Sequence, residues 1–313
     1  MKIIDNIANF DCSASAVTIG FFDGVHRGHV ALLHKLTKEA HKRSLASVVV
    51  TFAIHPREGL HANYVPKLLT THAERMQLLE QQGVDICVLL KIDHKMFEMS
   101  SGSFMHHVLF EKLNTKYLLV GHDHHFGCDR ENGYVHYKEC GDKYGIEVEQ
   151  ANPFPGNGLN ISSSLIRKAL EEGNINQASE WLGYRFYIEG TIVQGHKIGR
   201  SIGFPTANIA INDVRKLIPH EGVYAVDVEF EGEKEILHGM LNIGIRPTFV
   251  TVTVAKSIEV NIFDFNQDIY QKKIKVFFLD YLRSEIKFDS PEKLTAQLND
   301  DRAAVLKWFE QKQ

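Results

Sequence analysis

The segment AVTIGFFDGVHRGHV, residues 16–30, runs from a short β-branched stretch through a glycine-rich turn into a stretch with helical apolar spacing. Residues 16–20 predict a buried strand, because small and β-branched apolar side chains suit a sheet covered on both faces. Residues 30–43 carry apolar positions at helical spacing and end in Lys and Arg, which predicts a helix. The segment therefore begins a strand–helix–strand crossover.

The same alternation continues through the first half of the chain. The strands are expected at residues 47–52, 85–90 and 116–120, and the helices at 71–82 and 103–113. Alternating strands and helices give right-handed crossovers and a doubly wound parallel sheet. Ligands of such sheets bind at the carboxyl ends of the strands, where the turn at residues 20–29 lies.

The pattern changes after a helix predicted at residues 162–172 and a short helical connector at 173–184. Many short strands follow, and one helix at about residues 291–309 closes the chain, with Ser290 as its N-cap. This order predicts a small antiparallel β-barrel with a helix packed on it. We therefore expect an α/β domain at residues 1–183 and a barrel domain at 184–313. The strand candidates are residues 186–193, 223–230, 236–243, 257–263 and 273–278.

Composition limits the class of protein. The 313 residues are 44% hydrophobic and 24% charged, which suits two globular domains, and the formal net charge of −4 argues against a general nucleic-acid-binding surface. The first residues lack the pattern of a signal peptide, and no stretch approaches the ~20 apolar residues that span a bilayer. The four cysteines are scattered without a C-x-x-C pair, so a reducing compartment fits. We expect a cytoplasmic enzyme with no nucleic-acid or membrane partner, and the sequence does not indicate its oligomeric state.

The turn at residues 20–29 has the features of a phosphate site. A glycine-rich turn lets the backbone approach a phosphate, and the N-terminus of the following helix presents free N–H groups. His26 and His29 can both reach one phosphate, where imidazoles that donate hydrogen bonds would stabilise the charge of adenylyl transfer. The alternative is a joint whose histidines cap the helix or lie on the surface, but the complete string G-x-F-D-G-V-H-x-G-H favours catalysis. The expected nucleotide-binding residues here are Gly20, Phe22, Asp23, Gly24 and Gly28.

This string resembles the H-x-G-H nucleotidyltransferase superfamily, and its F-D-G-V-H form is similar to the prokaryotic bifunctional riboflavin kinase/FAD synthetases. Three further segments resemble that family: TFAIHP at 51–56, with Ile54 where proline is usual; VGHDHHFG at 120–127; and ISSSLIR at 161–167. The resemblance implies that Asp123 and Phe126 lie at the flavin, and that a triphosphate clamp is formed by Ser163, Ser164 and Arg167. Without it, the serines would be interpreted only as a helix cap.

The histidines at 122, 124 and 125 have a competing interpretation as a metal site, because imidazole is a good ligand for borderline metals. No cysteine or carboxylate set at ligand spacing accompanies them, so the flavin-synthetase loop is favoured. His124 stands where the family has phenylalanine, which affects the stacking of flavin or adenine rather than the reaction.

Residues 190–208, GTIVQGHKIGRSIGFPTAN, carry the second expected site. The chain has no G-x-x-x-x-G-K-[ST], which excludes a classical P-loop, and glycine spacing alone would fit a barrel turn. The full string resembles the riboflavin kinase signature. The resemblance implies that Thr206 and Asn208 hold Mg²⁺, for which oxygen ligands are suitable. It also implies that the ATP phosphates lie against Gly195, Lys197, Gly199 and Arg200.

Later segments of the barrel resemble the same family. Glu259, in the string E-V-N-I, is the expected general base, because the riboflavin hydroxyl must lose a proton as it attacks the γ-phosphate. The alternative is an outward carboxylate on a strand. The string L-R-x-E-x-K-F implies that Arg283 lies near the flavin. Gln271 stands where glycine is common, and it costs stability if that position needs a positive φ.

The two motif sets imply two reactions with ATP as co-substrate and Mg²⁺ as cofactor: riboflavin is phosphorylated to FMN, and FMN is adenylylated to FAD with release of pyrophosphate. One alternative is a nucleotidyltransferase for another small substrate with a non-catalytic barrel. Another is a flavin-binding regulator without catalysis. The complete P-T-A-N string and Glu259 argue against the first alternative. A regulator should have lost at least one of His26, His29, Thr206, Asn208 and Glu259, and all five are present.

Overall fold

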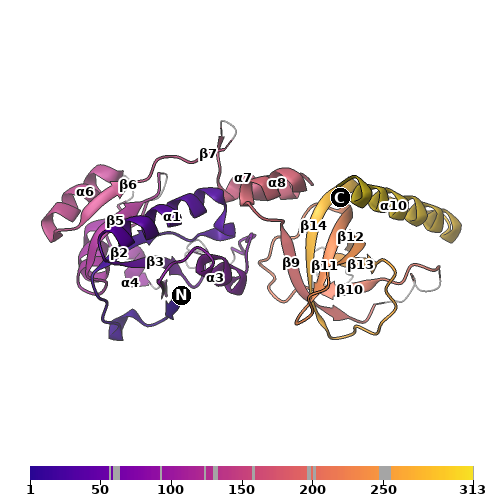
Figure 1. The fold of residues 1–313 in the computed structure, drawn as a ribbon, viewed down its shortest axis with the longest axis horizontal. Coiled ribbons are helices and arrows are strands. Elements are labelled where there is room, and N and C mark those ends of the chain that lie inside the picture. The colour runs from indigo at the N-terminus through magenta and orange to yellow at the C-terminus, as the bar shows by residue number, and fades with distance from the viewer. Residues whose placement is uncertain are drawn as a thin grey trace. The chain divides into compact units, whose positions relative to one another are not determined.

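The computed structural model describes residues 1–55, 58, 64–91, 94–122, 125–129, 133–156, 159–195, 199, 202–246 and 255–312. They form two compact units, Met1–Ser163 and Ser164–Gln313 (Figure 1). A parallel sheet with helices, followed by an antiparallel barrel and a closing helix, confirms the predicted fold class. The compact units divide between Ser163 and Ser164, earlier than the expected domain boundary after residue 183, which stays a prediction for the catalytic domains.

The first unit is built on a six-stranded sheet with the order β1-β4-β3-β2-β5-β6, in which neighbouring strands are parallel. From β2 the chain proceeds through β3 to β4 on one side and returns to β5 on the other. The carboxyl ends of β2 and β5 therefore flank the topological switch point, where such sheets bind ligands. The strands are β1 Lys2–Ile4, β2 Ser15–Ile19, β3 Ala46–Phe52, β4 Ile86–Leu90, β5 Thr115–Val120 and β6 Glu147–Gln150.

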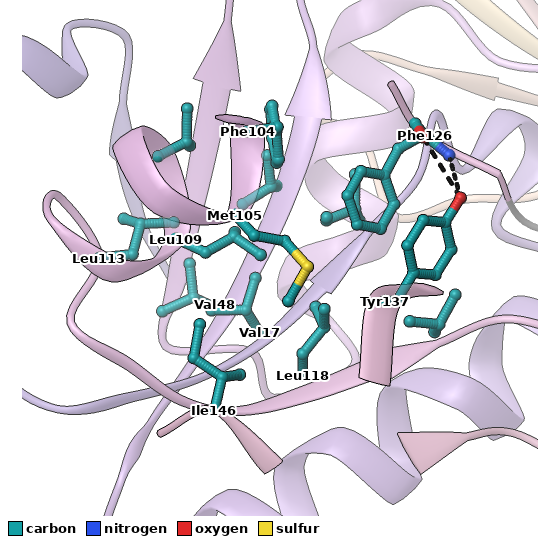
Figure 2. Packing of buried hydrophobic residues seen from close by; sticks show 14 of the residues in the cluster. Val17, Val48, Phe104, Met105, Leu109, Leu113, Leu118, Phe126, Tyr137 and Ile146 are labelled. Atoms are coloured by element: carbon teal, nitrogen blue, oxygen red, sulfur yellow. Dashed lines mark hydrogen bonds between the residues drawn. The ribbon is translucent and has the colours of Figure 1, made fainter. Parts of the chain in front are cut away.

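Helices cover both faces of this sheet, because successive strand residues point to opposite faces. Val49 packs with α1 (Arg27–Lys42) and α3 (His72–Glu80). Its neighbours belong to the opposite cluster, in which Figure 2 shows Met105 and Leu109 over Val17, Val48 and Leu118. That face is covered by α5 Ser101–Phe104, the π-helix η3 Met105–Phe110 and α6 Gly133–Tyr144. The other short elements of this unit are η1 Ile7–Asn9, η2 Asp23–Val25, α4 His94–Glu98, β7 Pro155–Gly156 and β8 Leu159–Asn160.

The second unit contains a closed barrel of six antiparallel strands in the order β10-β13-β12-β11-β14-β9. Five of them correspond to the predicted strands, and the sixth, β10, begins in the P-T-A-N string and extends two residues beyond it. The strands are β9 Tyr187–Val193, β10 Ala207–Ala210, β11 Gly222–Phe230, β12 Leu237–Arg246, β13 Ala255–Ile262 and β14 Lys273–Arg283.

Helices attach to the barrel on β14. The Asp280 carboxylate accepts hydrogen bonds from Asn176 Nδ2 of α8 (Ile175–Leu182) at 3.0 Å and from Trp308 Nε1 of α10 (Pro291–Lys312) at 2.8 Å. Helix α10 is capped by Ser290, as predicted, since the N–H of Lys293 donates to its hydroxyl. The helix α7 (Ser163–Glu171) precedes α8. Among the helices that the structure describes, none is long and apolar enough to cross a bilayer.

Candidate active sites

The turn after β2 has an unusual backbone. Phe22, Gly24 and Val25 have φ angles of 57°, 79° and 36°, so two non-glycine residues occupy the left-handed region. Both Phe22 and Val25 are buried. Such conformations cost of the order of 1–3 kcal/mol each and persist only where surrounding contacts impose them. They gather at functional sites more often than elsewhere, which agrees with the predicted role of this turn.

Asp23 fastens this turn to the segment before α3. Its buried carboxylate accepts hydrogen bonds from the N–H groups of Leu69 and Thr70, both at 3.1 Å, and from the Thr70 hydroxyl at 3.2 Å. The Ser163 hydroxyl donates to the Asp23 carbonyl at 2.9 Å, so one residue of the predicted phosphate clamp lies at the turn. These contacts of Asp23 with Leu69, Thr70 and Ser163 hold the turn in place, and its role at the nucleotide stays a prediction.

The two predicted catalytic histidines lie together at the start of α1. His26 is the N-cap, and its Nδ1 accepts a hydrogen bond from the His29 N–H at 3.4 Å. Their rings stack with centroids 3.7 Å apart and planes inclined by 18°. A Cβ on Gly28 would lie 3.2 Å from the His26 ring, so glycine leaves room for the stack. Both imidazoles therefore share the positive end of the helix dipole, where an anion is favoured.

The loop after β3 also reaches this turn. The Phe21 ring contacts the His55 ring edge-on, with centroids 4.8 Å apart. His55 belongs to the TFAIHP string, so two of the predicted motifs meet at the carboxyl edge of the sheet. Gly20 approaches Phe22 so closely that a Cβ would lie 2.8 Å from its ring.

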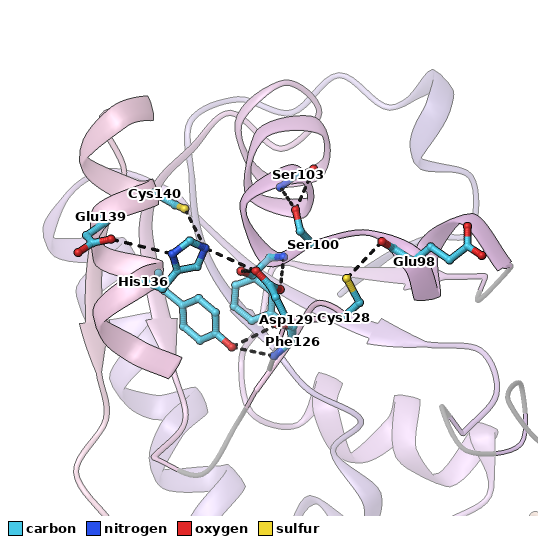
Figure 3. Close-up of polar contacts among 11 residues, drawn as sticks. Glu98, Ser100, Ser103, Phe126, Cys128, Asp129, His136, Glu139 and Cys140 are labelled. Atoms are coloured by element: carbon cyan, nitrogen blue, oxygen red, sulfur yellow. Dashed lines mark hydrogen bonds and ion pairs between the residues drawn. The ribbon is translucent and has the colours of Figure 1, made fainter. Parts of the chain in front are cut away.

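After β5, residues 126–129 are anchored to the core by stacking and hydrogen bonds (Figure 3). Phe126 is 7% exposed and stacks on Tyr137 with centroids 4.2 Å apart, while the Tyr137 hydroxyl bonds to the backbone of Phe126. The Asp129 carboxylate accepts hydrogen bonds from the Ser101 N–H at 2.7 Å and hydroxyl at 2.8 Å. Phe126 therefore serves the core here, and its flavin contact stays a prediction. Asp123 lies outside the described residues.

The same region brings together a cysteine, a histidine and an aspartate, but not as a nucleophilic triad. Cys140 and Asp129 both approach Nε2 of His136, each at 3.5 Å, whereas a relay needs its partners on opposite ring nitrogens. Burial also raises the pKa of the Cys140 thiol, which disfavours the reactive thiolate.

Among the described residues, metal-ligating side chains converge at His106, His107 and Glu111 rather than at His122 and His125. The His107 ring bonds to the Glu111 carboxylate at 3.0 Å, and this hydrogen bond lowers the pKa of Glu111. His106 Nε2 lies 3.9 Å from the other Glu111 oxygen, and the three side chains are exposed or half-exposed. His124 lies outside the described residues, so the metal interpretation of the 122–125 cluster stays untested.

The second site gathers on β10 and β13. The Thr206 hydroxyl donates to the Glu259 carboxylate at 3.2 Å, and Asn208 is the direct cross-strand partner of Glu259. A Cβ on Gly195 would lie 2.1 Å from Asn208 Nδ2, and one on Gly199 would lie 3.4 Å from Thr206 Oγ1. Gly195 and Gly199 of the glycine-rich string therefore lie directly against the P-T-A-N residues. Two of its predicted phosphate ligands, Lys197 and Arg200, lie outside the described residues.

A cavity of about 720 Å³ opens beside Thr206. Its volume is within the range of small-molecule sites. Its lining includes apolar residues of three barrel strands and polar residues of the segment after β13, among them Ile192, Val260, Ile262, Asn266, Asp268 and Tyr270.

The remaining predicted residues have local partners. Arg283 forms a bidentate ion pair with Asp301 of α10, with Nε–Oδ1 and Nη2–Oδ2 distances of 2.8 and 2.6 Å. Arg167 donates to the Ser164 hydroxyl at 3.3 Å, and both residues belong to the second unit. The flavin role of Arg283 and the phosphate role of the other two stay predictions.

The sheet has stacked histidines at its switch point, and in the barrel Thr206 and Asn208 lie between Glu259 and two glycines, Gly195 and Gly199. These features define a two-domain nucleotidyl- and phosphoryl-transfer enzyme. Residues 10–165 match the family model for FAD synthetase, and residues 182–309 match that for riboflavin kinase. This chain belongs to the family of bifunctional riboflavin kinase/FMN adenylyltransferases.

The relatives match over the full length. The bifunctional riboflavin kinase/FMN adenylyltransferase of Buchnera aphidicola subsp. Schizaphis graminum is 38% identical over 99% of both chains. The enzyme of the same name from Escherichia coli strain K12 is 36% identical over 99% of this chain and 98% of its own. A crystal structure from Streptococcus pneumoniae, described as a macrolide-efflux protein, has a TM-score of 0.88 at 33% identity and covers 98% of each chain.

Proposed function

We propose that this chain makes FAD in two steps: the barrel phosphorylates riboflavin with ATP, and the sheet domain transfers an adenylyl group from a second ATP to the FMN formed. The observation that carries the proposal is that each of the two family matches falls on its own constellation. His26 and His29 lie in the first, and Thr206, Asn208 and Glu259 lie in the second.

In the kinase step, Glu259 acts as the general base. The terminal hydroxyl of riboflavin attacks the γ-phosphorus of ATP, its proton passes to the carboxylate, and ADP leaves. The hydrogen bond from Thr206 to Glu259 fixes the orientation of the carboxylate. A positioned base of this kind contributes about 10²–10⁴ in rate.

Mg²⁺ is the cofactor that fits this site. Asn208 of β10 and Glu259 of β13 are cross-strand partners, and Thr206, directly before β10, bonds to Glu259. A hydroxyl, an amide carbonyl and a carboxylate therefore lie together, and hard oxygen donors are the ligands that Mg²⁺ prefers. Thr206 and Asn208 would hold the ion, which when bound neutralises charge on the ATP phosphates. Lys197 and Arg200, with Gly195 and Gly199, would contact the same phosphates.

In the adenylyl-transfer step, a phosphate oxygen of FMN attacks the α-phosphorus of ATP and pyrophosphate leaves. His26 and His29 donate hydrogen bonds to the α-phosphate and to the leaving group, so that they stabilise charge without forming a covalent intermediate. The phosphates lie at the turn of Gly20, Phe22, Asp23, Gly24 and Gly28 and in a clamp of Ser163, Ser164 and Arg167. The flavin is held by Asp123 and Phe126 in this site, and by Arg283 in the kinase site.

All of these substrates are small molecules of the cytoplasm, and we assign the protein to that compartment without a nucleic-acid or membrane partner. The test follows riboflavin, FMN and FAD by chromatography after purified protein is incubated with riboflavin, ATP and MgCl₂. The expected result is FMN followed by FAD, and neither product when EDTA exceeds the metal. Flavin binding with no turnover would favour the regulator instead.

Two variants separate the steps. His29→Ala should accumulate FMN and form FAD slowly, because a contact to the transition state is lost in the first site only. Glu259→Gln should form FMN from riboflavin about 10²–10⁴-fold more slowly but should still convert supplied FMN to FAD. Normal FMN formation by a folded Glu259→Gln protein would contradict the assignment of the base.

A further inference from the structure

Arg75 is a buried cation next to the adenylyl-transfer turn, and no motif in the sequence includes it. It lies in the first turn of α3 and is 2% exposed. Burial of a guanidinium group is unfavourable unless its N–H groups are hydrogen bonded, so its partners explain why an arginine occupies this position.

Its partners are the carbonyl groups at which two strands end. Nη1 donates to the Phe21 carbonyl at 3.1 Å, and Nη2 donates to the Phe52 carbonyl at 2.7 Å. The guanidinium carbon also lies 4.1 Å from the centroid of the Phe21 ring. Phe21 lies two residues after Ile19, the last residue of β2, and Phe52 is the last residue of β3. One side chain therefore bridges the points at which both motif loops leave the sheet.

The two hydrogen bonds of Arg75 fix the direction in which the chain enters the catalytic turn. A peptide group is planar, so fixing the Phe21 carbonyl also fixes the N–H of Phe22, the first left-handed residue of the turn. The Thr51 hydroxyl donates to the same carbonyl at 3.3 Å and holds this peptide from a second direction. The Phe21 ring, held under the guanidinium, is in turn the contact surface for His55.

We propose that Arg75 is a positioning residue for adenylyl transfer, which fixes the spacing between the His26–His29 turn and the loop that carries His55. The inference rests on the proposed function of the first domain. Arg75 is buried and acts through the two carbonyls rather than by touching a substrate. A lysine has a single ammonium point and cannot reproduce the planar fork that bridges two acceptors.

The experiment compares Arg75→Met and Arg75→Lys with the parent in the full chain. Small displacements of reacting groups cost about 100-fold in rate, so kcat for FMN adenylylation should fall about 100-fold in Arg75→Met and by less in Arg75→Lys, with KM for FMN changed less than fivefold. Riboflavin phosphorylation by the same proteins is the internal control and should stay within twofold.

A core variant of the same unit distinguishes the positioning role of Arg75 from a purely structural one. Leu113 is fully buried at the opposite end of β2, where the Ser15 hydroxyl donates to its carbonyl at 2.6 Å. Leu113→Ala should lower the Tm of the unit at least as much as Arg75→Met but should keep kcat for adenylylation within threefold well below that Tm.

The inference is overturned if folded Arg75→Met or Arg75→Lys retains the parent kcat, or if Leu113→Ala loses as much kcat as the arginine variants. If Arg75→Met does not fold, the kcat of Arg75→Lys decides between these outcomes. A parent protein that phosphorylates riboflavin but makes no FAD would instead refute the proposed function of the first domain, so the two failures are distinguishable.

Discussion

The position of α8 in the barrel unit leads to a quantitative prediction for Leu182→Ala. Leu182, Ile175 and Ala178 are each at most 1% exposed, and α8 packs on β14. Replacing a buried leucine by alanine removes favourable burial and leaves a cavity, at a cost of about 2–5 kcal/mol. With a urea m-value of about 2 kcal/mol/M, the unfolding midpoint of the barrel unit should fall by about 1–2.5 M.

Tryptophan fluorescence measures this unit selectively. The two tryptophans of the chain, Trp181 and Trp308, both lie in Ser164–Gln313. Urea titrations of the parent and of Leu182→Ala, followed by tryptophan emission and by riboflavin phosphorylation, should show the same displaced midpoint. The loss of FMN adenylylation with urea should be unaffected.

A matched control is Val214→Ala, because the Val214 side chain is 86% exposed and its truncation should leave the midpoint unchanged. An unchanged barrel midpoint in Leu182→Ala, together with earlier loss of adenylylation, would refute the reasoning. It would mean that α8 belongs energetically to the sheet domain, with the boundary after residue 183.

Three further predictions concern single residues. Gln271 has a φ of 65°, so Gln271→Gly should relieve backbone strain and stabilise the barrel by about 0.5–1 kcal/mol, measured as a rise in its urea midpoint. Asp301→Ala leaves the partly exposed Arg283 unpaired and should lower that midpoint by about 1 M, while an equal midpoint would show that the ion pair adds nothing. The hydrogen bond from Lys35 lowers the pKa of Glu149 below its ordinary value of 4.5. The ionised carboxylate therefore stabilises the sheet unit above pH 4.5, and this stability is lost as the pH falls through the lower pKa of the folded state. Glu149→Gln should flatten the dependence of the free energy of unfolding on pH between about pH 5 and 3.

The central strands could be predicted from the sequence because each is a continuous apolar run buried on both faces. The unpredicted strands lack that local signal. Two of the three residues of β1 are exposed, and its position depends on pairing with β4, which lies more than eighty residues away in the chain. Strand β10 begins in the P-T-A-N string, whose residue types indicate a binding loop and give no signal of strand pairing.

The residues of the candidate sites also differ in whether the local sequence identifies them. His26, His29, Thr206 and Glu259 stand in contiguous strings, so their residue types and spacing could be identified from the amino-acid sequence alone. Arg75 stands in no string, and its significance depends on two carbonyls that are 54 and 23 residues away in the sequence. The partners of a buried cation are set by tertiary structure, which a local pattern does not contain.

The turn between β2 and α1 is where local preference and fold disagree most clearly. Phe22 and Val25 are bulky, and Val25 is β-branched, so neither favours the left-handed conformation that it adopts. The hydrogen bonds to Asp23 from the segment before α3, and the hydrogen bond from Arg75 to the Phe21 carbonyl, impose that conformation from outside the turn. Conflicts of this kind are expected where a protein accepts strain to position reacting groups. The geometry of the two histidines is therefore a property of the whole sheet edge rather than of the H-x-G-H string, which alone would have capped a helix equally well.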